Sequence, residues 1–507
     1  MSTALAASVD ASAAAGLLRS LDGGVMDPTA YDTAWVARLV ERGNPRRALF
    51  PQCAEWLLGA QHADGSWGAA PETLHDRVAA TLAAMTALEG LVRRDVPLSE
   101  PGEAVHRRVQ AGLGYLARRA ADLAADPWET VGFELAVPVL LIEARDLGLT
   151  LPWERFAFVA ERRAAKLARL PRGWQGQVGA TMVHTLEGWG SEVGTQFPSL
   201  RAADGSCANS PSATAFYYSR LPDETARAYL QECVRRGAGG VADVYPFDIF
   251  EAAWVLDHFA LGGVPARGRA VTALLRRLAA AWEAGGGAVG IASAGLEPDA
   301  DDTALAGVVL FRAGHPVHAG ALAAFRRPGG FACFPFERNP SVSANIHAAY
   351  AIQTLPFPDR EGALAVIRDF LADARHSGGY WTDKWHASPW YATCRAVATL
   401  GGRWPDLLAP AVDWLLDGQR ADGSWGFFGG TVEETAYAVE ALAQVRGVRR
   451  RAARRAISRA RPYLLGVSPE PRPALWIGKG LYHPRAVVEA AVQAALRLSA
   501  RAGGDRP

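Results

Sequence analysis

The chain has 507 residues; half of them are hydrophobic, about a fifth are charged, and the formal net charge is +1. This balanced charge gives no electrostatic reason to expect a nucleic-acid partner. The five cysteines lack paired spacing, so they predict neither a zinc site nor a disulfide framework and favour the reducing cytoplasm.

No membrane-spanning segment is expected. Residues 1–20 lack the basic start that opens a signal peptide. No apolar run approaches the roughly 20 residues that cross a bilayer. The sequence therefore predicts a protein without a membrane span.

Helical patterns fill most of the chain. Ala, Leu, Arg and Glu dominate, apolar residues recur at spacings of three and four, and Gly/Pro clusters separate the patterned segments. Clear examples are residues 104–119, 269–284, 362–374 and 487–498. Because alternating strand patterns are nearly absent, the sequence predicts an all-α fold.

One eight-residue segment occurs twice, as QHADGSWG at 61–68 and as QRADGSWG at 419–426. Each copy follows an apolar helix. The Asp-Gly pair favours a turn, because glycine adopts positive φ without strain. The Gln amide and the Trp ring can then clamp consecutive helices. The repeat predicts two related helical domains.

An acidic segment carries the sharpest chemical signal. Asp299, Asp301 and Asp302 precede an apolar helix expected over 305–311, where acidic residues commonly cap a helix N-terminus. A capping cluster is therefore the alternative to a chemical role. In a dry pocket, however, clustered carboxylates cannot all ionise, so one stays protonated and can act as a strong acid.

Further segments resemble one enzyme family, in the same order along the chain. They read AYDTAW at 30–35, HTLEGW at 184–189, SPSATA at 210–215, VYPFDIFEAAW at 244–254, DKWHASPWY at 383–391 and LWIGKGLY at 475–482. Together with DADDTA at 299–304 and the two Q-x-x-x-G-S-W turns, they resemble bacterial class II diterpene cyclases.

The resemblance implies two α/α-barrel domains, called β and γ in that family, with the active-site cavity between them. The β-domain would comprise residues 1–30 and 255–507 and carry the acid motif. The γ-domain would be the inserted segment 31–254.

The resemblance also implies a reaction. The middle aspartate of the family's D-x-D-D motif is the proton donor, so Asp301 would be the acid and Asp299 and Asp302 its polarising partners. The chain has no DDxxD motif of the ionising synthases, so the diphosphate should be retained. Geranylgeranyl diphosphate would become a labdane-, halimane- or clerodane-type bicyclic diphosphate, which a downstream class I terpene synthase would process.

A retained diphosphate implies a cation. Glu129 and Glu134 resemble the family's acidic magnesium motif, and hard oxygen ligands suit Mg²⁺; two surface or capping glutamates are the alternative. Lys479 would anchor the phosphates by resemblance, with Lys384 as a second candidate. Solvated loop lysines are the alternative for both.

Aromatic rings could stabilise the cationic intermediates through cation–π attraction. Trp385, Trp390 and Phe336 are candidates for this contact, and simple core packing is the alternative. The base that ends the reaction stays open among four residues that are as readily explained as hydrogen-bonded core: His386, Tyr391, His347 and Asn345.

Two other functions stay open. One is a cyclase of another polyprene, either farnesyl diphosphate or a squalene-type substrate; for squalene, Glu129, Glu134 and Lys479 would serve no purpose. The other is a non-catalytic isoprenoid-binding α-barrel protein, which would have no use for three carboxylates in a cavity. The oligomeric state also stays open, a homodimer included.

Overall fold

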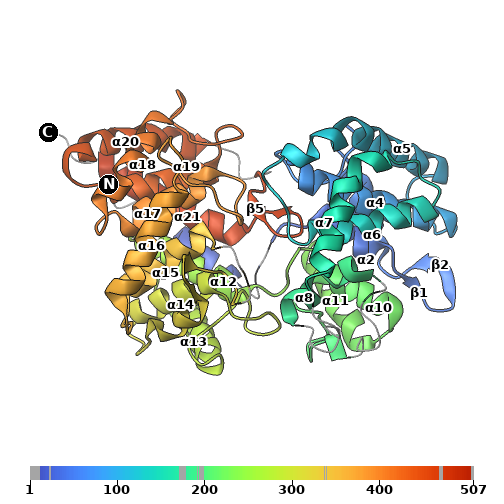
Figure 1. Cartoon of the computed structure of the whole chain (residues 1–507), viewed down its shortest axis with the longest axis horizontal. Coiled ribbons are helices and arrows are strands. Elements are labelled where there is room, and N and C mark those ends of the chain that lie inside the picture. The colour runs from blue at the N-terminus through green and yellow to red at the C-terminus, as the bar shows by residue number, and fades with distance from the viewer. Residues whose placement is uncertain are drawn as a thin grey trace.

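The computed structural model describes residues 12–21, 24, 26–170, 179–190, 192, 199–335, 337, 340–466 and 472–503. Helices predominate in this part of the chain, and they form two lobes (Figure 1). Its strands pair into three small antiparallel sheets: β1 (Val40–Glu41) with β2 (Asn44–Ala48), β3 (Arg326–Arg327) with β4 (Gly330–Phe331), and β5 (Trp476–Ile477) with β6 (Leu481–Tyr482). The all-α prediction is confirmed.

The first lobe, at the left of Figure 1, is an α-barrel with two layers. Each inner helix contacts the next and the last contacts the first: α12 (Asp248–Gly262), α14 (Ala300–Arg312), α15 (Val342–Thr354), α17 (Pro389–Leu400), α19 (Val432–Ala443) and α21 (Arg485–Gly503). The outer layer includes α13 (Arg269–Ala284), α16 (Arg360–Ala374), α18 (Pro405–Asp417) and α20 (Arg450–Gly466).

Residue pattern separates the two layers. The inner α12 is buried almost all round, and its buried residues include Asp248, Glu251, Asp257 and His258 as well as apolar ones. The outer α13 buries only one stripe at spacings of three and four: Val271, Leu274, Leu278 and Trp282. The barrel therefore has an inner helix that is buried on almost every side and an outer helix that buries only one face.

The second lobe repeats this plan on a smaller scale. Its inner ring comprises α2 (Ala30–Ala37), α4 (Leu74–Arg93), α6 (Phe133–Asp146), α9 (Leu186–Trp189) and α10 (Pro211–Arg220). Around it lie α3 (Pro51–Gly59), α5 (Gly102–Arg119), α7 (Ala157–Leu167) and α11 (Glu224–Arg236), and α8 (Ala180–His184) precedes α9.

Each lobe has its own large hydrophobic core. One core takes residues between Ala14 and Met26 and between Val244 and Ala495, and the other takes residues between Ala30 and Val241. Where the chain passes from one lobe to the other and back, its two segments lie side by side, because the Thr29 N–H donates to the Val241 carbonyl at 2.9 Å. The second lobe is thus an insertion into the first.

The β5–β6 hairpin ties the lobes together. The turn of this hairpin reaches the second lobe, where the Val131 N–H donates to the Gly478 carbonyl at 2.7 Å. The Leu481 N–H donates to Asp76 Oδ1 at 2.9 Å. These bonds hold the hairpin against the second lobe, and the bond from the Ile477 N–H to the Trp385 carbonyl, at 2.9 Å, holds it against the first.

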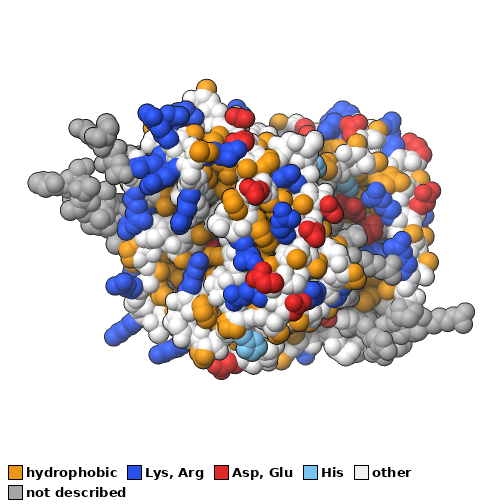
Figure 2. Space-filling model, turned by 60° about the vertical axis from the view of Figure 1, so that its left-hand side comes forward, with side chains coloured by type: hydrophobic (Ala, Val, Ile, Leu, Met, Phe, Trp, Pro, Cys, Tyr) orange, Lys and Arg blue, Asp and Glu red, His pale blue; other side chains and the backbone are white. Residues whose placement is uncertain are grey.

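The surface shows hydrophobic, basic and acidic side chains intermingled, with basic side chains prevailing toward the left of the view (Figure 2). Helix α20 alone carries six arginines and no acidic residue. No described helix combines the length and the apolar character needed to cross a bilayer.

Candidate active site

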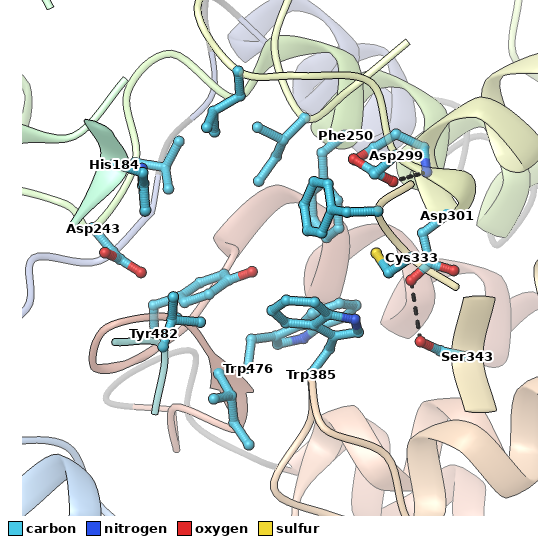
Figure 3. Close-up of a pocket in the computed structure, with 18 of the residues that line it drawn as sticks. His184, Asp243, Phe250, Asp299, Asp301, Cys333, Ser343, Trp385, Trp476 and Tyr482 are labelled. Carbon is cyan, nitrogen blue, oxygen red and sulfur yellow. Dashed lines mark hydrogen bonds between the residues drawn. The ribbon is translucent and has the colours of Figure 1, made fainter. Parts of the chain in front are cut away.

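A cavity lies between the two lobes. It encloses about 950 Å³ of empty space, its open mouth included, and residues of both lobes line it. Most of its wall is apolar, with seven large rings: Phe250, Trp254, Phe334, Trp385, Tyr391, Trp476 and Tyr482. Its polar side chains gather at two ends that face each other in Figure 3.

One polar end is the start of α14. Asp299 is the N-cap residue of this helix, and its Oδ1 accepts the Asp302 N–H at 2.8 Å. All three aspartates of the motif line the cavity. The capping interpretation therefore holds for Asp299, while Asp301 in the first turn reaches toward the hollow (Figure 3).

The side chain of Asp301 is held by α15. His347 Nδ1 lies 2.9 Å from Asp301 Oδ1, and the Ser343 hydroxyl lies 3.1 Å from Asp301 Oδ2. His347 is fully buried, and the Asp301 side chain is 14% exposed. The carboxyl group thus has both oxygens positioned and still faces the cavity.

The neighbouring carboxyl groups keep protons readily. Burial raises the pKa of Asp299 to about 7, and the charge of Asp301 adds to the effect. Burial and then the charge of Asp299 raise the pKa of Asp302 well above its ordinary value. Near neutral pH, this end of the cavity therefore holds protons that exposed aspartates would have lost.

The opposite end is formed by His184 and Asp243 (Figure 3). His184 Nδ1 lies 2.9 Å from the Ala208 carbonyl, so Nδ1 is the donor and Nε2 keeps a lone pair. Burial and then the charge of Lys479 lower the pKa of His184 to about 3. Burial and then the charge of Asp32 raise the pKa of Asp243 well above its ordinary value. The sequence interpretation assigned no role to either side chain.

Lys479 does not line the cavity. It is buried between the lobes, with Nζ 3.3 Å from Asp32 Oδ1 and 3.2 Å from Glu187 Oε1, and its backbone N–H donates to Asp243 Oδ2. Burial opposes its charge, but these carboxylates outweigh the burial and raise the pKa of Lys479. Nζ also donates to three further oxygens, those of Ser210 Oγ, Ser212 Oγ and the His184 carbonyl. All the donor capacity of this ammonium group is therefore taken up by the protein itself.

Lys384 lies near the acid end. Its Nζ is 2.7 Å from Glu337 Oε1 and 4.9 Å from the centre of the Trp385 ring. Glu337 also accepts the backbone N–H of Cys333, a residue that lines the cavity beside the aspartates. This places Lys384 away from the His184 end.

The structure separates the two tryptophan candidates. Trp385 lines the cavity. Trp390 does not, because its ring stacks on Trp414 with ring centres 3.9 Å apart, and it contacts the end of α18 at Gly418. Its role is barrel packing. Phe336 lies outside the described residues.

Glu129 and Glu134 flank Val131, which lines the cavity at the His184 end. Glu129 Oε2 lies 3.4 Å from Arg162, and Glu134 pairs with Lys166, so both carboxylates meet cations of α7. Among the described residues, no group of three or more His, Cys, Asp or Glu side chains is arranged to hold a metal ion.

Of the four residues considered as the terminating base, only Tyr391 lines the cavity. His347 is hydrogen-bonded to Asp301. His386 Nε2 lies 3.1 Å from Glu433 Oε1, and Asn345 bonds to the Phe331 backbone.

No family model matches the chain. The chain is 32% identical to a type B diterpene cyclase from Mycobacterium tuberculosis, over 95% of this chain and 97% of that relative. It is 33% identical to a copalyl diphosphate synthase from Streptomyces cyslabdanicus, over 95% and 94%. Among solved structures, it is similar to ent-copalyl diphosphate synthase from Streptomyces platensis, with a TM-score of 0.80, 33% identity and coverage of 97% of this chain and 99% of that one. The structure has a cavity between two α-barrels that is lined by aromatic rings and ends in three aspartates. Since relatives also match 95–97% of its length, the chain belongs to the bacterial class II diterpene cyclases.

Proposed function

We propose that the enzyme converts geranylgeranyl diphosphate into a labdane-, halimane- or clerodane-type bicyclic diphosphate, with the diphosphate retained. The observation that carries this proposal is the Asp301 carboxyl group, which faces an aromatic cavity while His347 and Ser343 hold its two oxygens. The names of the relatives, diterpene cyclase and copalyl diphosphate synthase, support a diterpene-sized prenyl diphosphate as the substrate.

Asp301 starts the reaction as the acid. Its proton passes to the terminal alkene of the substrate, and the electron pair of each alkene in turn forms a ring bond and moves the positive charge along the chain. Asp299 and Asp302 support proton retention at this end, since burial raises the pKa of both. The cavity contributes shape and exclusion of water.

The aromatic wall can stabilise the moving charge. Phe250, Trp385 and Trp476 line the cavity between its two polar ends (Figure 3). A ring face near a cation in a dry site contributes on the order of 1–2 kcal/mol. These rings attract charge without offering a nucleophile that would trap the intermediate.

His184 is the base that we propose for the last step. Its Nε2 has a lone pair because Nδ1 donates to the Ala208 carbonyl, and the lowered pKa keeps the ring neutral. A proton leaving the bicyclic cation would pass to Nε2, which balances the proton that Asp301 gave up. The reaction is then an isomerisation, with both residues reset by proton exchange with solvent.

Mg²⁺ is the cation that we propose for the diphosphate end, held by Glu129 and Glu134. Support comes from their position beside Val131 in the cavity wall and from the preference of Mg²⁺ for carboxylate and phosphate oxygens. When bound, Mg²⁺ would neutralise part of the diphosphate charge. The present partners of the two glutamates, Arg162 and Lys166, would then be available to phosphate oxygens. Neither Lys479 nor Lys384 has a comparable position.

We also propose a β-domain and an inserted γ-domain, with the second boundary between Val241 and Val244, where the hydrophobic cores change, rather than at residue 254. The five cysteines are free and buried, which supports the cytoplasm as the compartment. A product that keeps its diphosphate would be a substrate for a class I terpene synthase.

The acid assignment is tested with Asp301→Asn. We expect no bicyclic product from geranylgeranyl diphosphate, because an amide cannot supply the proton, and a thermal midpoint close to that of the unchanged enzyme. Products are dephosphorylated and identified by mass spectrometry and NMR. Asp369→Asn, at a side chain that is 76% exposed, is the control and should keep full activity. Full activity of Asp301→Asn would remove the acid assignment and favour another function.

The metal proposal is tested with Glu129→Gln/Glu134→Gln. We expect the Mg²⁺ concentration for half-maximal rate to rise at least about tenfold, because amide oxygens carry no charge. Exposed Glu103→Gln is the control. A cyclase of squalene-type chains would instead need no Mg²⁺, and a non-catalytic binder would retain substrate without forming product.

A further inference from the structure

Behind Asp301 lies a series of buried polar side chains that contact one another and that take no direct part in the proposed reaction. His347 on α15 meets Asp301 with Nδ1, and Arg395 on α17 donates its Nε–H to His347 Nε2 at 3.1 Å. Arg395 Nη2 in turn lies 2.9 Å from Asp257 Oδ2 on α12. His347 and Asp257 are fully buried and Arg395 is 2% exposed.

Asp257 and Arg395, the two residues of this series that lie farthest from Asp301, form an ion pair. Burial raises the pKa of Asp257, but the charges of Arg395 and Arg312 outweigh it and hold the pKa below its ordinary value. Asp257 Oδ1 also accepts from the Tyr350 hydroxyl and from Arg312, both at 3.2 Å. Because a guanidinium group stays protonated, Arg395 always presents an N–H to His347.

This donor decides where the imidazole proton sits. A neutral histidine carries one N–H, and a nitrogen that accepts a hydrogen bond cannot carry it. Since His347 Nε2 accepts from Arg395, the proton is on Nδ1, and Nδ1–H donates to Asp301 Oδ1. A second proton on Nε2 would face the Arg395 N–H and its positive charge.

The tautomer then decides which oxygen of Asp301 can be the acid. Oδ1 accepts the His347 proton, so the acid proton belongs on Oδ2, the oxygen beside Ser343. The same bond from Nδ1–H stabilises the carboxylate that remains after proton transfer. With the opposite tautomer, a lone pair would face Oδ1 and draw the acid proton away from the substrate.

We propose that Arg395, held by Asp257, is a positioning residue that fixes His347 as its Nδ1–H tautomer and thereby fixes Oδ2 as the proton-bearing oxygen of Asp301. The part that concerns Asp301 as the acid depends on the proposed function. The tautomer of His347 depends only on the geometry of the buried series.

The variant that tests the proposal is Asp257→Asn/Arg395→Met. Removing Arg395 alone would leave the carboxylate of Asp257 buried without its counter-ion and could unfold the barrel. The paired change removes both charges and the donor to His347, while the amide introduced at position 257 still offers an oxygen to Tyr350. Thermal unfolding of the double variant checks that the barrel is intact.

Kinetics in two backgrounds separate tautomer control from a merely structural role. With His347 present, the paired change should lower kcat at least about tenfold and leave KM nearly unchanged, because neither residue touches the substrate. In a His347→Asn background it should change kcat less than about threefold, since an amide N–H near the position of Nδ1 needs no partner to fix it. Equal losses in both backgrounds, or no loss in either, would overturn the proposal.

¹⁵N NMR spectroscopy determines the tautomer of His347 in the absence of any reaction. In ¹⁵N-histidine-labelled enzyme, the signals absent from His347→Asn belong to His347. They should show a protonated Nδ1 and an unprotonated Nε2, and the paired variant should shift the ring toward the Nε2–H form or a mixture. An Nε2–H ring in the unchanged enzyme, or a tautomer that the paired variant leaves intact, would refute the proposal. If the unchanged enzyme forms no bicyclic product, the proposed function fails while this measurement still decides the tautomer.

Discussion

His184 shows how one folded side chain can be kept ready to accept a proton. Its ordinary pKa of 6.5 falls to about 3, first through burial and then through the charge of Lys479. Between these two values the unfolded chain binds a proton at this residue and the folded chain does not. The free energy of unfolding should therefore decrease as the pH falls from about 6.5 toward 3, and this contribution is fully present above pH 6.5.

Replacing His184 with Asn should remove that part of the pH dependence. The Asn side chain has no basic nitrogen, and its amide N–H can still donate to the Ala208 carbonyl. In denaturant unfolding between pH 6.5 and 4.5, the slope of stability against pH should be smaller in the variant by up to about 1.4 kcal/mol per pH unit. A single measurement at pH 7.5 gives the loss from packing alone. Parallel slopes in variant and unchanged enzyme would contradict a buried, neutral His184.

At the scale of single residues, the sequence predicted a chemical role for Asp301 but gave no indication of the proton state of His184. The motif at 299–302 is local, so its spacing alone suggests clustered carboxylates. The proton state of His184 instead depends on Ala208 and Lys479, which lie far along the chain. The ordered proton of His347 likewise depends on Arg395, a partner that no local pattern reveals.

At the scale of elements, the repeated turn explains both what the sequence predicted and what it missed. Gln61 and Gln419 make the same pair of amide bonds, each at 2.9 Å. One goes to the turn glycine carbonyl, and the other goes to a carbonyl of the next outer helix, α5 or α20. Trp67 and Trp425 donate their ring N–H groups to the preceding helix at Leu57 and Leu415. A Gln–Trp clamp is therefore present in both barrels, but it joins neighbouring outer helices, α3 to α5 and α18 to α20, rather than helices that are consecutive in sequence.

The same backbone turn occurs twice more with only part of the letters of the repeat, as AADGSC at 202–207 and as HSGGYW at 376–381. The Ala202 N–H donates to the Ser206 carbonyl at 2.8 Å, and the His376 N–H donates to the Tyr380 carbonyl at 2.9 Å. The residue after each turn then donates its N–H to a threonine hydroxyl, as Trp67 and Trp425 do. Both of these turns lack the initial Gln, since Arg201 and Arg375 stand in its place. A search for the full eight-residue pattern therefore finds only two of the four turns.

Helix α12 illustrates a second limit at this scale. Its residues are buried almost all round, the polar Asp257 and His258 included, so no exposed face tells which core it joins. The sequence interpretation placed residues up to 254 in the inserted domain, whereas Phe247 and Ile249 belong to the core of the first lobe. The neighbours of a helix that is buried on all sides depend on the topology around it, which its own sequence does not give.

At the scale of the whole molecule, Lys479 joins the lobes electrostatically. The carboxylates around it come from α2, α9 and the segment that returns from the second lobe: Asp32, Glu187 and Asp243. Each has one oxygen without a hydrogen-bond partner in the described part of the chain. One ammonium group thus compensates carboxylates that are far apart in sequence, which is why its surroundings could not be anticipated from the motif LWIGKGLY.

Lys479→Met and Lys384→Met form a matched test of this view. The first change leaves buried carboxylates without a counter-ion and should lower the free energy of unfolding by about 3–5 kcal/mol at pH 7. The second removes a partly exposed ion pair with Glu337 and should cost no more than about 1 kcal/mol. Denaturant unfolding of both variants beside the unchanged enzyme gives these differences.

Acidification should then separate charge from packing in the Lys479→Met variant. As the pH falls from 7 to 5, the uncompensated carboxylates can take up protons in the folded state, so the deficit relative to the unchanged enzyme should shrink. Asp243 should protonate readily, because burial and the charge of Asp32 raise its pKa. A deficit that stays constant over this range would mean that the lost packing of the Lys479 side chain, and not its charge, had held the lobes together.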